Sequence, residues 1–220
     1  MKKLIFIALV FLSISIILPA SAFDIGATYY RQMNESGSFG PSDGVKITAI
    51  PETLPIYAWG SWEHTRFTMA DQPMGYMDVI GIGLGVKKNI INGISLFLDG
   101  GWYHPQWYKN GELIYPVAGD IGEMGFLYLN EKYSDTLGVH YFDSYKASIS
   151  GNFGGSFGAE WKYNLSKSFL ISTMISYRIL SLPMWVEGIG IDSPGGGNWC
   201  RYEDLSLSGV GINAGIVWNF

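Results

Sequence analysis

The end of the chain, residues 205–220, constrains the fold more than any other stretch. From position 210 onward every second residue is apolar, and the residues between them are mostly glycine or asparagine. A period of two is the signature of a β-strand, because successive side chains point to opposite faces. An apolar face that closes the chain with two aromatics is unusual for a strand in water, where termini fray, and typical of a transmembrane barrel strand. We assign Val210, Ile212, Ala214, Ile216, Trp218 and Phe220 to the lipid-facing side of this closing strand.

The first residues have the three parts of a secretory signal. Lys2 and Lys3 precede an apolar run from Leu4 to Leu18, and Ala20-Ser21-Ala22 is a small-residue cleavage site. A spanning helix is the alternative, but the run falls short of the roughly 20 residues that a bilayer requires. The sequence therefore predicts a signal peptide over residues 1–22 and a mature chain that begins at Phe23.

The composition after the signal favours strands over helices. The chain is rich in glycine and in tyrosine, tryptophan and phenylalanine, and only 15% of its residues are charged. Removing Lys2 and Lys3 takes the formal net charge from -5 to -7, which argues against nucleic acid as a partner. The single cysteine, Cys200, excludes an internal disulfide framework.

Alternating patterns between turn signals predict eight strands. They cover residues 24–31, 45–50, 56–69, 76–87, 93–103, 147–163, 168–185 and 205–220. The facing of the third strand stays open: placing Glu63 in the lumen also places Tyr57 and Trp59 there, unless a bulge near Gly60 intervenes. The interval 105–146 is the longest. Its ends are candidates to extend the neighbouring strands, and a short helix is considered around 121–133.

An even number of strands places both termini on the same side of a membrane. Three short intervals, 51–55, 88–92 and 164–167, then fall on the side of the termini, and the other intervals, mostly longer, fall on the opposite side. Short periplasmic turns and long extracellular loops are typical of outer-membrane barrels. We predict an all-β fold, an eight-stranded antiparallel up-and-down transmembrane β-barrel over 23–220, with periplasmic termini, a long extracellular loop at 105–146 and 186–204 as the last loop.

The lumen of this barrel is expected to hold a polar network. The predicted inward-facing charged residues are Glu63, Asp99, Glu160, Lys162 and Arg178. Unpaired charges in a narrow lumen are costly, so these residues should hydrogen-bond to one another. A register that sets Phe169 opposite Tyr163 places Arg178 opposite Gly154, too high to meet Glu160, and Glu63 becomes its expected partner across the lumen. We interpret the network as structural, with a gated ion path as the alternative.

A closing strand that ends in phenylalanine, within an eight-strand pattern, resembles the small bacterial outer-membrane β-barrel proteins of the OmpA/OmpX type. The resemblance implies a protein of the outer membrane that contacts lipid, lipopolysaccharide and the barrel-assembly machinery. It also implies extracellular loops with an adhesive, protective or receptor role toward an extracellular ligand or host surface. A small OmpW-like hydrophobic channel is an alternative.

A lipid A-modifying enzyme, an acyltransferase or deacylase, is the rival class. Such barrels place a histidine with a serine and an acid at the outer rim, and His64, His104 and His140 all map to that side. His140-Tyr-Phe-Asp143-Ser144 supplies the residue types, but the His-x-Ser-Asn signature of the deacylases is missing. We expect no catalysis and no cofactor, and no metal site, because no two histidines have ligand spacing.

Overall fold

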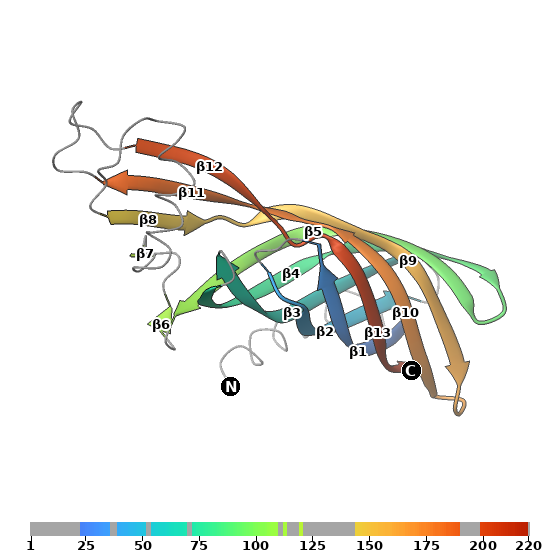
Figure 1. Cartoon of the computed structure of the whole chain (residues 1–220). Coiled ribbons are helices and arrows are strands. Elements are labelled where there is room, and N and C mark those ends of the chain that lie inside the picture. Colours follow the sequence, from blue (N-terminus) through green and yellow to red (C-terminus); the bar gives the residue numbers. More distant parts are fainter. Residues whose placement is uncertain are drawn as a thin grey trace.

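The computed structural model of this chain describes residues 23–35, 39–51, 54–69, 72–109, 112–113, 119–120, 144–189 and 199–219. Everything described is β-structure and its connections (Figure 1). No helix in these ranges is long and apolar enough to cross a membrane.

Eight antiparallel strands form a closed barrel. They are β1 (Phe23–Asn34), β2 (Ser42–Pro51), β3 (Ile56–Met69), β4 (Gln72–Ile91), β5 (Ile94–Lys109), β9 (Asn152–Asn164), β10 (Phe169–Ile179) and β13 (Gly209–Asn219). Each strand pairs with its neighbours in the order β4-β3-β2-β1-β13-β10-β9-β5, and β4 pairs with β5 to close the circle. The predicted fold class and strand number are therefore confirmed.

The closing strand β13 joins the first strand of the barrel to β10. It pairs with β1 along its length, from Asn219 opposite Asp24 to Gly209 opposite Asn34, and with β10 on its other edge. Val210, Ile212, Ala214, Ile216 and Trp218 are exposed on the outside, whereas Gly211, Asn213 and Val217 are buried inside, as the alternation predicted. Phe220 lies outside the described residues.

One end of the barrel carries its tight turns, and we call it the turn end. There β4 passes to β5 through Asn92 and Gly93, and the positive φ of Gly93, 81°, suits glycine in so short a turn. The β9–β10 turn is held by the Ser166 hydroxyl, which accepts hydrogen bonds from the amides of Ser168 and Phe169. The start of β1 and the end of β13 lie at this same end (Figure 1).

At the opposite end, three barrel strands continue into a second sheet. It consists of β7 (Gly119–Asp120), β8 (Ser144–Ile149), β11 (Ser181–Ile189) and β12 (Trp199–Ser206), in the order β12-β11-β8-β7. We call this sheet the extension sheet; it projects to the upper left in Figure 1. A two-residue strand β6 (Glu112–Leu113) pairs with the end of β5.

The extension sheet corrects one prediction and refines another. Residues 186–204 are not all loop. β11 reaches Ile189, β12 begins at Trp199, and the two strands pair with each other. The interval 105–146 does extend its neighbouring strands, with β5 reaching Lys109 and β8 beginning at Ser144. The helix considered for 121–133 lies outside the described residues.

The interior near the extension sheet is filled by apolar side chains. Eight of them are almost completely buried, and we call the group the apolar cap: Phe67, Met77, Trp107, Ile149, Leu180, Leu182, Met184 and Leu207. The rings of Phe67 and Trp107 meet edge to face with centroids 5.3 Å apart, which links β3 to β5 across the interior. The cap covers the lumen on that side.

Candidate functional site

The barrel lumen gathers most of the buried charges of the described chain, and Arg178 and Glu63 are the most deeply buried pair. The guanidinium of Arg178 on β10 donates two hydrogen bonds to the Glu63 carboxylate on β3, one through Nη1 and one at 3.1 Å through Nη2. Its Nε donates to the Leu207 carbonyl at 3.0 Å. Tyr30 adds a hydroxyl donor to Glu63 at 2.9 Å. The pair expected from the sequence is present, and its charges are compensated.

Asp99 on β5 forms the centre of a second cluster. Its carboxylate accepts from Lys46 Nζ at 2.5 Å, from the Tyr57 hydroxyl at 2.9 Å and from the Ser156 hydroxyl at 2.5 Å. The Ser156 amide donates to it as well, at 3.2 Å. These four hydrogen bonds offset part of the cost of burying the carboxylate.

A third cluster lies toward the turn end. Glu160 on β9 pairs with Lys87 on β4 and accepts a hydrogen bond of 2.6 Å from the Ser172 hydroxyl. Lys162 Nζ lies 3.6 Å from Oδ2 of Asp24, at the start of β1. In these clusters every cation faces a carboxylate, so the described lumen carries no excess of either charge.

Two predictions about the wall need correction. The β9–β10 register is displaced by two residues: Ile171, not Phe169, lies opposite Tyr163, and Arg178 lies opposite Ser156, not Gly154. The reason is the turn, since its Ser166-centred hydrogen bonds define the end of the ladder. The bulge considered near Gly60 does not occur, because β3 pairs with β4 without a shift from Ile56 to Phe67. Tyr57 and Trp59 therefore face inward beside Glu63.

Lys46 is the partner that sequence reasoning missed. It lies on β2, whose inward face was not assigned. The structure places it opposite Ser61 on β3, with its ammonium over the Trp59 ring and bonded to Asp99. Lys87, which pairs with Glu160, was not among the residues of the predicted network. Tyr30, Tyr57 and Ser156 were not recognised as hydrogen-bond donors to the carboxylates.

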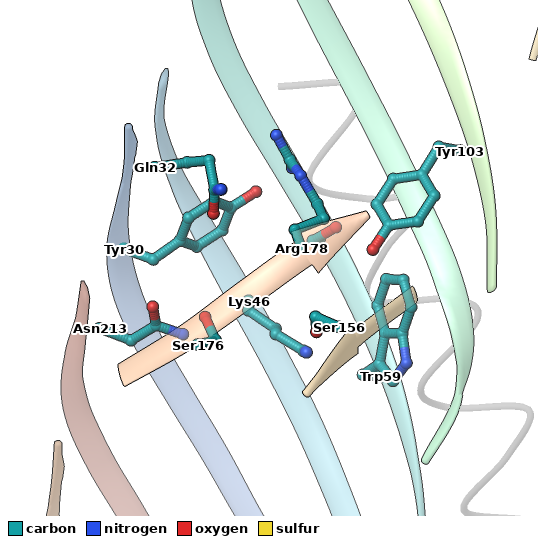
Figure 2. A pocket seen from close by; sticks show the side chains of 10 residues that line it. Tyr30, Gln32, Lys46, Trp59, Tyr103, Ser156, Ser176, Arg178 and Asn213 are labelled. Atoms are coloured by element: carbon teal, nitrogen blue, oxygen red, sulfur yellow. The ribbon is translucent and has the colours of Figure 1, made fainter. Parts of the chain in front are cut away.

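A small cavity of about 30 Å³ remains between the Asp99 and Glu63 clusters. Its wall includes the charged ends of Lys46 and Arg178 and the rings of Tyr30, Trp59 and Tyr103 (Figure 2). Eight strands give an interior just wide enough for side chains to fill, and between these two clusters they leave room for little more than water.

The outer surface of the barrel is apolar. Its exposed residues include Leu84, Leu98, Ile175 and Ile212, on four different strands. Near the turn end a ring of exposed aromatics follows, comprising Trp161, Tyr163, Phe169 and Trp218, and the last two stack with centroids 5.8 Å apart. An apolar band with an aromatic girdle is the surface that a membrane requires.

His64 and His104 lie apart from the lumen. His64 is on the outer face of β3, where its Nδ1 is 2.7 Å from Asp78 Oδ1 and its ring stacks on Tyr76 at 4.9 Å between centroids. His104 is exposed on β5, and His140 and Asp143 lie outside the described residues. The structure thus pairs His64, a predicted rim histidine, with an acid.

A closed eight-stranded antiparallel barrel with an apolar exterior and a polar, ion-paired lumen is the architecture of the small bacterial outer-membrane β-barrel proteins. The chain has this fold.

Comparison with solved structures agrees with this class. The outer membrane protein OprG from Pseudomonas aeruginosa superposes with a TM-score of 0.51 at 10% identity, over 91% of this chain and 96% of OprG. Ail from Yersinia pestis gives 0.43 at 14% identity over 91% and 99% of the two chains, and Neisserial surface protein A gives 0.42 at 8% over 90% and 96%. No protein-family model and no curated protein matches the sequence. At such identities the likeness to OprG shows the fold alone.

Proposed function

We propose that this protein is a sealed outer-membrane barrel that acts at the cell surface through its extension sheet and the connections around it. The observation that carries the proposal is the contrast between a filled lumen and a sheet that extends beyond the barrel. Ion-paired clusters and the apolar cap occupy the interior, with a cavity of only about 30 Å³ between them. Three of the eight barrel strands continue past it as β8, β11 and β12.

The orientation follows from the connections. The turn end carries tight turns, and in outer-membrane barrels such turns are periplasmic. This supports our proposal that both termini are periplasmic and that the extension sheet is extracellular. We propose separately, from the sequence, that residues 1–22 are removed as a signal peptide. Protease added to intact cells should then cut within 105–146 and spare the turn at 165–168. Cleavage at the turn with the long segment protected would reverse the orientation.

The outer face of the extension sheet offers a contact surface. Trp185 and Tyr202 are cross-strand neighbours on β11 and β12, 37% and 67% exposed, and their rings meet edge to face at 4.6 Å. Exposed aromatics with a fixed geometry are favoured at binding surfaces, because they supply large contact area at little entropic cost. The partners that we propose are lipopolysaccharide beside the barrel and an extracellular ligand or host surface above it, while the barrel-assembly machinery acts during insertion.

A binding assay tests this surface. Cells that express Trp185→Ala or Tyr202→Ala should lose most of the protein-dependent binding to host cells, matrix or purified lipopolysaccharide. Tyr163→Ala is the matched control, since Tyr163 is as exposed as Tyr202 but lies at the turn end. Binding that is unchanged in both extension variants, with normal assembly, would contradict the proposed surface.

Conductance tests the sealed lumen. Purified protein in planar lipid bilayers should give no steady ion current, and vesicles that contain it should not admit small hydrophobic solutes faster than empty ones. A stable single-channel current, or accelerated uptake, would favour the channel alternative.

A second candidate, a lipid A-modifying enzyme, is favoured by one observation. The Asp78 carboxylate fixes the His64 ring on the outer face of the barrel, as an acid orients a general base. In the described part of the chain, however, no serine is hydrogen-bonded to His64. Mass spectrometry of lipid A from cells with and without the protein decides between the classes. We expect no change; a protein-dependent gain or loss of an acyl chain that falls by a factor on the order of 10²–10⁴ in His64→Ala would establish the enzyme.

A further inference from the structure

The outer face of the extension sheet carries a corner made of two aromatic rings. Trp185 on β11 and Tyr202 on β12 are cross-strand neighbours, and their rings stand at 80° to each other with centroids 4.6 Å apart. Because the rings are nearly perpendicular, one forms the floor of the corner and the other its wall. Both rings keep surface that is open to water, since Tyr202 is 67% exposed and Trp185 37%. We call this arrangement the aromatic corner.

A carboxylate without a partner lies beside the aromatic corner. Asp204 follows Tyr202 by two residues on β12, so both side chains are on the same face, with Cα atoms about 7 Å apart. Asp204 is exposed, and in the described part of the chain its carboxylate has neither a hydrogen bond nor an ion pair. Every other acid whose side chain is described, from Asp24 on β1 to Glu160 on β9, has a hydrogen-bond or ion-pair partner. Asp204 is therefore the acid that remains available to a guest.

The charge around the aromatic corner favours a cation. Among the side chains that the structure describes on this face, Asp204 is the only charged one. Further along the sheet, Lys146 and Glu187 are register partners of opposite charge, so they add no net charge. The formal net charge of the predicted mature chain is -7, the -5 of the whole chain less Lys2 and Lys3. An acidic protein attracts positively charged partners and repels anionic ones.

The aromatic rings select among positively charged groups. The face of an aromatic ring is the negative pole of its quadrupole and attracts an organic cation. A guanidinium group is planar, so it stacks on a ring while its N–H fork donates two hydrogen bonds to a carboxylate. An ammonium group is a compact, strongly hydrated charge that does not stack, and a quaternary ammonium has no N–H for Asp204. The combination of ring and carboxylate therefore fits arginine best.

We propose that the aromatic corner and Asp204 bind the guanidinium group of an arginine side chain on an extracellular protein. The guanidinium stacks on a ring of the corner and donates to the Asp204 carboxylate. The inference rests on the surface role proposed above and names the chemistry of its partner. Tryptophan, tyrosine and arginine are the residue types that carry most of the binding energy at protein interfaces. One arginine alone binds so exposed a site weakly, with a Kd on the order of millimolar.

An NMR titration of the full-length mature protein in detergent micelles tests the site. The probes are N-acetylarginine amide and N-acetylcitrulline amide, which has nearly the same shape but no charge. We expect saturable shifts of the Trp185 indole N–H and of the Tyr202 and Asp204 amides with the arginine probe. The affinity for citrulline should be at least about tenfold lower, and that for arginine should fall as salt is added. Equal affinity for the two probes, or no saturable shift with arginine, would overturn the proposal.

Two substitutions at exposed positions separate the carboxylate from the ring. Asp204→Asn keeps the shape and removes the charge, so the affinity for arginine should fall severalfold and lose most of its salt dependence. Tyr202→Phe keeps the ring and removes the hydroxyl, so it should bind arginine as the wild type does. Asp43→Asn is the matched control, because Asp43 lies on β2 and already accepts a hydrogen bond from Tyr29. Unchanged affinity in Asp204→Asn, or a large loss in Tyr202→Phe, would contradict the assigned contacts.

The result can be told apart from that of the surface role. If Trp185→Ala abolishes binding to host cells but the arginine probe gives no saturable shift, the surface role stands and the arginine site is wrong. If the probe binds at the corner but Trp185→Ala leaves binding to host cells unchanged, the arginine site stands and the surface role is wrong.

Discussion

The two parts of the barrel interior are filled in opposite ways. Within the apolar belt the interior holds ion pairs and hydroxyl groups around Glu63, Asp99 and Glu160, whereas next to the extension sheet it holds the apolar cap. A barrel wall has two faces, and the solvent on the outside determines which face must be polar. Where lipid covers the outer face, polar side chains point inward; where water covers it, the apolar side chains point inward as in a soluble protein.

The change from polar to apolar side chains on the inner face is visible along β10 and β11. In β10, Ile175 and Ile179 are exposed and Arg178 is buried, but immediately afterward Leu180, Leu182 and Met184 are buried. The direction of each side chain still alternates, so only its chemistry has changed. The same inversion occurs in reverse along the chain between Leu205 and Ile212, from β12 to β13. Ile179–Leu180 therefore marks where the wall leaves the lipid.

The largest expected effect tests whether the polar part depends on pairing. Glu63→Leu leaves the Arg178 guanidinium buried without its carboxylate and should lower the free energy of unfolding by about 3–5 kcal/mol. Adding Arg178→Met should recover most of that loss, because an apolar pair of similar volume replaces both charges. Urea unfolding from lipid vesicles measures both variants. A double variant no more stable than the single one would show that the ion pair is needed for more than charge compensation.

The apolar cap should respond to lost volume. Leu182→Ala removes a fully buried side chain and should cost about 2–5 kcal/mol, depending on how far the cap collapses into the space. Leu165→Ala, at an exposed position in the β9–β10 turn, should change stability by less than about 0.5 kcal/mol. If the two variants unfold at the same urea concentration, the cap is not a packed core.

A charge on the outer wall should distinguish lipid from water. Leu84→Arg, like Ile175→Arg or Ile212→Arg, should cost about 2–4 kcal/mol, the penalty for arginine near the bilayer midplane. Asp204→Arg, exposed on the extension sheet, should stay within about 0.5 kcal/mol. Unfolding from vesicles again provides the comparison, and a costly Asp204→Arg would place the extension sheet in lipid.

The smallest effects concern the packing of the polar part. A Cβ at Gly83 would lie 2.2 Å from the Gly100 carbonyl oxygen, so Gly83→Ala must displace backbone and should cost about 1–3 kcal/mol. A Cβ at Gly211 would meet only the ends of two flexible side chains, Gln32 and Ser176, at 2.7 and 2.9 Å. Gly211→Ala should therefore cost less, and a reversed order in urea unfolding would mean that the lumen near Gly211 is the tighter of the two.

The sequence by itself determined the eight barrel strands, the faces of most of them and the closed barrel. Strands with a period of two and one apolar face lie against lipid. The unpaired N–H and C=O groups of an open sheet edge would find no hydrogen-bond partner there, so the eight strands must close into a barrel. The same alternation identified Glu63, Asp99, Glu160, Lys162 and Arg178 as inward residues, and relative height along the wall was enough to match Arg178 with Glu63.

Only the tertiary structure decided the partners that depend on register. The Ser166-centred turn displaced β9 against β10 by two residues, and no pattern of apolar residues detects such a shift, since an even displacement keeps every side chain on its own face. Lys46 on β2 reaches Asp99 on β5 past two intervening strands of the circle, β3 and β4, a contact that requires the curved wall of the barrel. The extension sheet was read as loop in part, because β12 becomes a strand through its pairing with β11. Local alternation determines on which face of the wall a side chain lies, whereas the closed barrel determines which residues it contacts.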